Sequence, residues 1–312
     1  SPYDINGLEK IREGEMTYPQ PWIKDGGGFL YLFTKYTKGR ELYWSTSDDG
    51  KTWSPDQKLA GMGGHYQVSN TWKNKVVSVF NYHPGGNVDK RTNCYLLQTT
   101  DAGKTWTTIT GKPVSTPVSE KAHESLVKDF EAENKLVYLN DLNFDKDGNP
   151  VILAVVSSHF QPGPAGDPRE WVLMHWKNDR WNFTTVCTST HNYDMGSLYI
   201  ENNFWQVIGP TEKGPQQYGT GGEMAMWTSN DAGKTWTKTK MLTAGSARNH
   251  GYARRPLNAH PDFYAIWADG DAEKLSESHL YFCNKKGDKV LQLPYDMKKD
   301  FEKPIPLPKG NK

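Results

Sequence analysis

The chain of 312 residues is long enough for one large closed repeat architecture or for two ordinary domains. Its 37 lysine and arginine residues and 36 aspartate and glutamate residues give a formal net charge of +1, which favours neither a nucleic-acid nor a membrane-surface partner. No apolar run approaches the length of a membrane span, and three widely spaced cysteines, an odd number, argue against a disulfide framework.

Aromatic residues are abundant (12 Trp, 16 Tyr and 11 Phe) and recur in short runs bounded by Gly, Asn, Asp and Pro. This pattern is typical of short, half-buried β-strands. Residues 1–15 are polar and irregular, and the one weak helix candidate is 120–133. The rest predicts five groups of four strands. In chain order these cover 18–24, 29–35, 41–47 and 57–60; 64–71, 76–82, 93–99 and 107–109; 136–143, 151–157, 171–176 and 181–186; 197–201, 204–208, 223–229 and 237–242; and 254–257, 263–268, 279–284 and 290–293.

An octet, Ser/Thr-x-Asp-x-Gly-x-Thr-Trp, follows the third strand of the first, second and fourth groups. The copies span 46–53, 99–106 and 229–236, and they place Asp48, Asp101 and Asp231 at the third position. An aspartate accepts hydrogen bonds from amides two or three residues further on, and glycine supplies the positive φ of a tight turn. Each octet is therefore expected to join the last two strands of its group, with its tryptophan packed beneath the turn.

The octets resemble the Asp box of sialidase-type β-propellers, in which this motif has a structural role. Eight further stretches resemble propellers that act on uronic-acid glycans, a family that includes ulvan lyases and the lyases and hydrolases of rhamnosyl-glucuronate linkages. They are Thr17-Tyr-Pro-Gln20, His65-Tyr-Gln-Val-Ser69, Phe80-Asn-Tyr-His-Pro-Gly85, Arg91-Thr-Asn93, His191-Asn-Tyr-Asp194, Gly196-Ser-Leu-Tyr199, Tyr218-Gly-Thr-Gly-Gly-Glu223 and Arg254-Arg-Pro256.

The resemblance implies an all-β fold, a β-propeller of four-stranded antiparallel blades forming a single domain over residues 1–312. Five blades can be read here, whereas the related proteins are seven-bladed and longer at the N-terminus. Two alternatives follow: a closed ring of five blades, or a larger propeller whose first blades lie outside this sequence. The chain departs from the family at His159-Phe160, where a tyrosine-bearing motif would be expected.

The implied reaction is β-elimination at a uronic acid joined to rhamnose. It needs a group that neutralises the carboxylate, a base for the C5 proton and an acid for the leaving oxygen. His65 and His83 are the leading pair, because each ends a predicted strand of one blade, and both are expected to project toward a shared cleft. Further candidate proton donors or acceptors are Tyr218, Tyr193 and His159.

Arginine and asparagine suit a substrate carboxylate or sulfate. The candidate substrate-binding residues are Arg91, Asn93, Arg169, Arg248, Arg254 and Arg255. Arg254 and Arg255 are adjacent, so in a regular strand only one of them would face the cleft.

His175, Cys187 and His191, with Asp194 close by, form a second constellation whose residue types can hold zinc. Their spacing matches no standard zinc motif, so a buried thiol beside hydrogen-bonded histidines is the alternative. No cofactor is expected for the chemistry itself, and the only metals considered are a structural zinc or calcium ion.

The sequence thus favours a polysaccharide lyase that acts on an anionic, uronate-containing glycan. A rhamnosidase acting on rhamnosyl-glucuronate and a non-catalytic glycan-binding propeller are the alternatives. We expect a monomer that is secreted, periplasmic or on the cell surface. The chain starts Ser-Pro-Tyr without a leader, as a processed product would.

Overall fold

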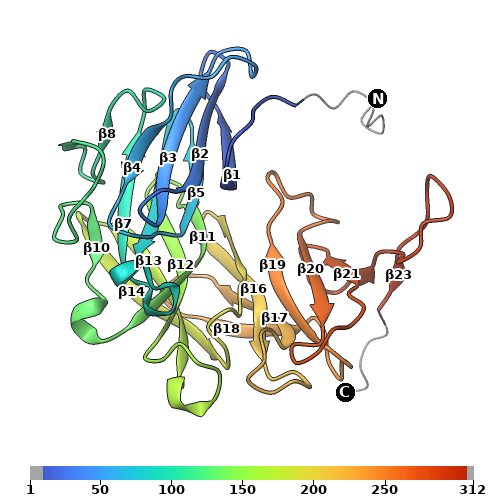
Figure 1. Ribbon diagram of the computed structural model, residues 1–312. Helices are drawn as coiled ribbons and strands as arrows, with labels where there is room; N and C mark the ends of the chain where they lie inside the picture. The colour runs from blue at the N-terminus through green and yellow to red at the C-terminus, as the bar shows by residue number, and fades with distance from the viewer. Residues whose placement is uncertain (1–9, 308–312) are drawn as a thin grey trace. The chain divides into compact units, whose positions relative to one another are not determined.

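The computed structural model describes residues 10–307, and this part of the chain is built from antiparallel β-sheets (Figure 1). It divides into two compact units, one up to Lys128 and one from Asp129 onward, and each is described by itself. Helical segments among the described residues are 3-10 turns of three residues. The helix expected over 120–133 is absent, because Leu126–Lys128 (β10) pairs with a strand and 131–133 forms a 3-10 turn.

The first unit holds two sheets in which the strands follow one another in chain order. The first sheet consists of β1 (Thr17–Ile23), β2 (Phe29–Tyr36), β3 (Arg40–Ser47) and β4 (Gln57–Ala60). The second consists of β5 (Gln67–Trp72), β6 (Lys75–Tyr82), β7 (Thr92–Thr99), β8 (Trp106–Thr107) and β9 (Pro113–Val114), with β10 on β7. Alternate side chains of both sheets meet in one core, which includes Leu30, Trp44, Phe80, Tyr95 and Trp106.

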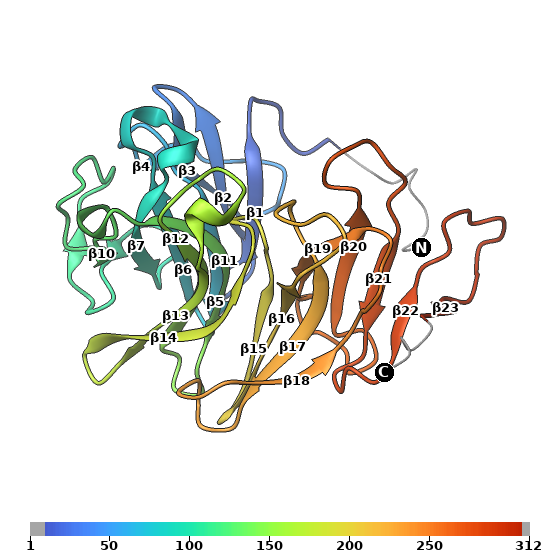
Figure 2. The ribbon, with the colours of Figure 1, turned by 90° about the horizontal axis from the view of Figure 1, so that it is seen from below.

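The second unit holds three sheets with the same meander order (Figure 2). They consist of β11 (Leu136–Phe144), β12 (Pro150–Ser157), β13 (Arg169–Lys177) and β14 (Arg180–Ser189); β15 (Ser197–Glu201), β16 (Phe204–Glu212), β17 (Glu223–Ser229) and β18 (Thr237–Met241); and β19 (Asn249–Arg254), β20 (Ala265–Gly270), β21 (Leu280–Cys283), β22 (Val290–Gln292) and β23 (Ile305–Pro306). Two further cores lie between these sheets. The all-β class is confirmed, and three of these five antiparallel sheets have the four strands expected of a blade, while the second and the last carry additional strands. One domain over 1–312 stays a prediction.

The first strand of the last sheet was wrongly placed at 254–257. The paired segment is Asn249–Arg254, because Pro256 cannot donate a ladder hydrogen bond and the strand ends before it. The other expected strands lie within a few residues of the observed ones.

Each octet forms the turn between the third and fourth strands of its sheet, and we call these three segments the octet turns. In the second copy Thr99 Oγ1 donates to Asp101 Oδ1 (2.8 Å), and the amide of Thr105 donates to the same oxygen (2.9 Å). Asp231 accepts the amide of Thr235 in the same way (2.9 Å).

The first octet was assigned one residue out of register. Here Asp49, not Asp48, accepts the amides of Lys51 (2.8 Å) and Thr52 (2.7 Å), and Ser47 takes the leading position. The turn is one residue shorter between its aspartate and Gly50, so the neighbouring Asp48 is left on the surface, paired with Lys24.

Within each unit the connections fall at two edges of the sheets. One edge carries the octet turns. The opposite edge, which we call the loop edge, carries connections 37–39, 61–66 and 83–91 in the first unit, and 158–168, 190–196, 213–222, 242–248 and 271–279 in the second. Loops at such an edge vary most in sequence and collect functional residues.

Candidate functional site

A cluster of cationic and aromatic side chains occupies the loop edge of the first unit. Tyr18 lies in a bulge of β1, Arg40 begins β3, Tyr66 precedes β5, His83 follows β6 and Arg91 precedes β7. Antiparallel pairing brings these strand ends to one edge, although the five residues are spread over more than seventy positions of sequence. We call them the Tyr66 cluster.

Tyr66 is the half-buried centre of this cluster. The guanidinium carbons of Arg40 and Arg91 each lie 4.6 Å from its ring centroid, and the imidazole of His83 lies 5.0 Å away. Its backbone amide donates to Asn81 Oδ1 (2.8 Å). Cation–π contacts and this hydrogen bond fix the phenol between two positive charges.

His83 is a buried neutral imidazole. Its Nε2 lies 3.1 Å from Asn81 Oδ1, an acceptor that also takes the amide of Tyr66, so Nε2 carries the proton. Its Nδ1 is enclosed beside Gly64 and has no hydrogen-bond partner. Burial, and then the positive charges of Arg91, His65 and Arg40, lower the pKa of His83 to about 3.

His65 is also fully buried, and both its ring nitrogens bind backbone. Nδ1 donates to the carbonyl of Asn81 (2.7 Å), and Nε2 accepts the amide of Met62 (3.1 Å). Burial lowers the pKa of His65 to about 4. The expectation that both histidines project toward a cleft is therefore not met, because neither ring has exposed surface, and His65 holds the 62–65 backbone in place.

Arg91 and Asn93, predicted together, have different surroundings. Arg91 joins the Tyr66 cluster and donates from Nε to the carbonyl of Val88 (2.8 Å). Asn93 has a left-handed backbone (φ 56°) and is buried, with Nδ2 3.4 Å from the hydroxyl of Tyr95. Arg91 therefore belongs to the cluster, and Asn93 contacts Tyr95.

The loop edge of the second unit contains His159, Tyr193 and Tyr218. His159 is half-buried, accepts the amide of Gln161 at Nδ1 (3.2 Å) and stacks on Phe160. Tyr193 packs edge-on against Tyr138, with ring centroids 5.2 Å apart.

Tyr218 lies in the glycine-rich connection 213–222, also with a left-handed backbone (φ 62°). Asn249 holds this connection, accepting the amide of Gln216 (3.1 Å) and donating to the carbonyls of Gln216 (2.9 Å) and Thr220 (3.2 Å). A Cβ at Gly222 would lie 2.1 Å from the carbonyl oxygen of Glu212, so glycine is required there. The packing fixes Tyr218 on a rigid support.

Asp194 joins two loops of this edge and was not predicted to do so. Its buried carboxylate accepts the amides of His191 (2.8 Å) and Thr190 (3.2 Å) from one loop and that of Gly221 (2.8 Å) from the other. Burial raises the pKa of Asp194 to about 7, against backbone hydrogen bonds that favour the ionised form. Beside it, burial and the charge of Arg169 lower the pKa of His191 to about 4.

Arg169 is a structural residue and not the predicted substrate ligand. It is fully buried, pairs with Asp167, and donates to the carbonyls of Gly163 (2.9 Å) and Gln161 (3.0 Å). It thus fastens the 158–168 connection from inside.

The other predicted arginines of this unit also have protein partners. Arg248 pairs with Asp269 (3.0 Å) and contacts His279. Arg255 pairs with Asp141 (3.4 Å), while Arg254 lies over Tyr252 and near the carbonyl of Asn140. Arg254 ends β19 away from the loop edge, because Asn249 at the other end pairs with Gly270. Arg254 and Arg255 are therefore not placed as ligands of this edge.

The predicted zinc residues do not come together. His175 pairs with Asn182 across the β13–β14 hairpin, and its Nε2 contacts Asp145 Oδ2 (2.9 Å). Cys187 pairs with Trp171 and packs in the core. It lies five residues along β14 from Asn182, the partner of His175, which at 3.3 Å per residue is roughly 16 Å. His191 lies beyond the strand end. Within residues 10–307, no three His, Cys, Asp or Glu side chains are arranged to bind a metal.

A protein-family model described as "BNR repeat-containing family member" matches residues 5–189, more than half of the chain. The chain belongs to this BNR repeat-containing family. It is 21% identical over 306 residues to an ulvan lyase of Nonlabens ulvanivorans, with 86% of this chain and 60% of the relative covered.

Two solved structures resemble this BNR-repeat chain in fold. One is a family 25 polysaccharide lyase, an ulvan lyase bound to -[GlcA(1-4)Rha3S]-, with a TM-score of 0.71, 14% identity, and 86% and 65% of the two chains covered. The other is a Trypanosoma rangeli sialidase in complex with an inhibitor, with a TM-score of 0.51, 14% identity, and 89% and 48% covered. The chain spans about 60% of the curated ulvan lyase and 65% of the solved one. Among its described residues, no helix is long and apolar enough to cross a membrane.

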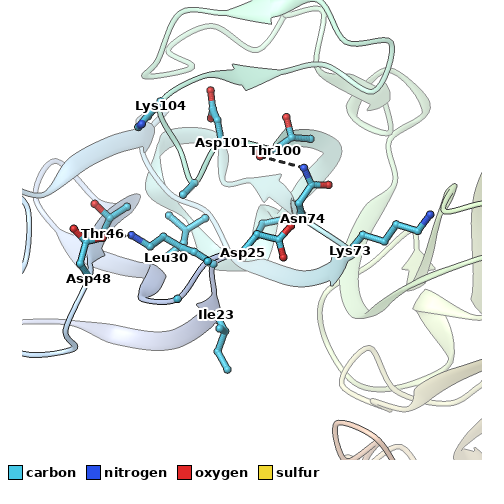
Figure 3. A pocket seen from close by; sticks show the side chains of 15 residues that line it. Ile23, Asp25, Leu30, Thr46, Asp48, Lys73, Asn74, Thr100, Asp101 and Lys104 are labelled. Atoms are coloured by element: carbon cyan, nitrogen blue, oxygen red, sulfur yellow. Dashed lines mark hydrogen bonds and ion pairs between the residues drawn. The ribbon is translucent and has the colours of Figure 1, made fainter.

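The octet-turn edge of the first unit carries a cavity of about 580 Å³, lined by Asp101, Asp48, Lys24 and Asn74 among others (Figure 3). The octets resemble a motif with a structural role, yet Asp101 lines this cavity. Its carboxylate is nevertheless engaged by its own turn, and Lys24 pairs with Asp48 (2.5 Å). The eight residues of β7 separate the cavity from the Tyr66 cluster by about 25 Å, so it is not part of that site.

Proposed function

We propose that the chain is a polysaccharide lyase that cleaves an acidic, uronate-containing glycan by β-elimination at the Tyr66 cluster. The observation that carries this proposal is the half-buried phenol of Tyr66 between the guanidinium groups of Arg40 and Arg91, against the neutral imidazole of His83. Proton-transfer groups and positive charge are thereby joined at one edge.

In the reaction the C5 proton leaves to a base, the C4–O bond breaks, a C4=C5 double bond forms, and the departing oxygen takes up a proton. In our proposal the positive charge of Arg91, a buried guanidinium in contact with Tyr66, offsets the charge of the uronate carboxylate, which makes the C5 proton more acidic. Tyr66, which is half-buried, transfers a proton to or from substrate, and the buried His83 contacts its ring from the protein side. His65 holds the adjoining backbone.

Three residues of the second unit stay predictions for proton transfer: His159, Tyr193 and Tyr218. The rigid support of Tyr218 by Asn249 favours it among them, because a positioned donor is worth more than a mobile one.

Relatives support the substrate class. The curated relative is an ulvan lyase, and the solved lyase was bound to a glucuronate–rhamnose-3-sulfate glycan. We therefore propose a glycan of uronate and rhamnose as the first substrate to test. A polymer of this kind implies a secreted, periplasmic or cell-surface enzyme, and we propose that it acts as a monomer.

A rhamnosidase is less well supported than a lyase. Hydrolysis by the common route uses two carboxylates, whereas the contacts of Tyr66 are with arginine, histidine and tyrosine. Incubation with a panel of uronate polysaccharides separates the possibilities. We expect new ultraviolet absorbance from an unsaturated uronate together with new reducing ends. New reducing ends without that absorbance would indicate hydrolysis, and binding without any product would indicate a glycan-binding propeller.

A further inference from the structure

The guanidinium group of Arg40 is surrounded by aromatic rings. Its guanidinium carbon lies 4.6 Å from the ring centroid of Tyr66, 5.0 Å from that of Tyr36 and 5.5 Å from that of Tyr18. Its Nε donates to the hydroxyl of Tyr36 (3.0 Å), and Nη2 contacts the same oxygen. Three tyrosines therefore surround one guanidinium.

The charge of Arg40 is not balanced by a carboxylate. Within residues 10–307 the hydrogen bonds and cation–π contacts of its side chain are with tyrosines, and its Nη1 is enclosed without a hydrogen-bond acceptor. An enclosed N–H without a partner costs free energy and calls for an explanation. Other arginines of the chain do have an acidic partner, as in the pairs Arg12–Asp56, Arg169–Asp167, Arg248–Asp269 and Arg255–Asp141.

Backbone strain accompanies this arrangement. Tyr18 has φ 55°, a left-handed conformation that a bulky residue rarely adopts, and the pairing of β1 with β2 slips between Thr17 and Gln20. The bulge turns the Tyr18 ring onto Arg40 and edge-on to Tyr66. Strain of this kind persists where the surrounding structure enforces it and is concentrated at ligand sites.

We propose that Arg40, with the hydroxyls of Tyr18 and Tyr36, forms an oxyanion subsite separate from Arg91. Tyr18 (47% exposed) and Tyr36 (55% exposed) are open to solvent, so a ligand can reach their side of the guanidinium. The ligand is an oxyanion on a sugar, a carboxylate or a sulfate ester, because a guanidinium fork with flanking hydroxyls matches both. The Arg40 subsite lies beside Tyr66. If Tyr66 is the reacting group, as in the proposed function on which this step rests, the subsite binds the sugar next to the one that is cleaved.

The test is saturation-transfer NMR on the full chain with three sugars: glucuronic acid, rhamnose 3-sulfate and unsulfated rhamnose. We expect at least one of the two anionic sugars to bind, and R40Q to weaken that binding about 10- to 100-fold, the size of one charge-assisted contact. R40K should restore part of it. The matched control is R180Q, at the exposed first residue of β14 in the second unit.

Which anionic sugar responds to R40Q identifies the group that the subsite takes. If R40Q does not fold, Y18F and Y36F keep the rings, remove the hydroxyls and should weaken the same binding several-fold. Wild type that binds neither anionic sugar, or variants that bind as well as wild type, would overturn the subsite. Binding does not depend on turnover, so an Arg40-dependent affinity in a protein without unsaturated product would retain the subsite and reject the lyase.

Discussion

At the residue scale, Tyr66 and His83 differ in their exposure to solvent and in their surroundings. Tyr66 is half-buried and reachable, whereas His83 is buried and held neutral by its surroundings. Asn81 connects them, since its Oδ1 accepts both the Tyr66 amide and His83 Nε2. In the proposed reaction the phenol is thus the group that meets substrate, and the imidazole sets its position.

Tyr66→Phe should lower turnover by about 10²–10⁴-fold, the usual worth of a positioned acid or base, with little change in Tm. The ring and its cation–π contacts remain, and only the hydroxyl is lost. Release of unsaturated uronate, measured beside melting curves, checks this. Tyr295→Phe, at an exposed position, is the control. Near-normal turnover in Y66F would move the proton transfer to Tyr218, Tyr193 or His159.

The sequence identified only part of this cluster. His83 and Arg91 could be named because they end strands and have side chains suited to the chemistry. Arg40 and Tyr18 could not, because their meeting depends on a bulge in β1 and on pairing between distant segments. Arg169 was predicted to bind substrate because its side chain is charged, but that side chain donates to carbonyls of its own connection.

At the element scale, the octet turns show what a short motif can and cannot determine. The sequence places a turn between two strands correctly, since aspartate and glycine encode it. It does not choose between Asp48 and Asp49, because either fits the pattern and only the hydrogen bonds decide. The zinc prediction failed for a related reason: composition does not give hairpin register, which sets His175 and Cys187 far apart on β13 and β14.

The register of the first octet turn can be tested with a neighbouring pair of variants. Asp49→Ala should lower Tm because two turn amides lose their acceptor, whereas Asp48→Ala should leave it nearly unchanged. Asp101→Ala should cost about 1 kcal/mol, the net worth of a typical hydrogen bond at an exposed site. Thermal unfolding of the three variants checks the order, and an equal loss for Asp48 and Asp49 would contradict the assignment.

The contacts of Asp194 with two loops can also be tested. Asp194→Asn should lower stability by about 1–3 kcal/mol, because one of the backbone amides that it now binds would face an NH2 donor. The connection 213–222 should open more often, and trypsin should cleave faster after the exposed Lys213. Asp147→Asn, on an exposed turn, is the control. Unchanged cleavage after Lys213 in D194N would mean that the two loops are held by other contacts.

At the scale of the whole molecule, the buried histidines should make the free energy of unfolding depend on pH. His83, His65 and His191 have pKa values lowered to about 3, 4 and 4 from the usual 6.5. The unfolded chain takes up their protons near pH 6.5, but the folded chain does not until much lower pH. Stability is therefore fully present above about pH 6.5 and falls as the pH falls toward these folded-state values.

His83→Gln tests this directly, because the glutamine amide can still donate to Asn81 while no group remains to titrate. Between about pH 6.5 and 4.5 the wild type should lose roughly 2 kcal/mol more than the variant, since each unit of unequal protonation is worth about 1.4 kcal/mol. Asp194, whose pKa is raised to about 7, acts in the opposite direction, but it is common to both proteins and cancels in the difference. Urea unfolding at a series of pH values measures the gap, with exposed His260→Gln as the control. Parallel curves for wild type and H83Q would mean that His83 takes up protons equally in the folded and unfolded chain over this range, and its lowered pKa would have to be abandoned.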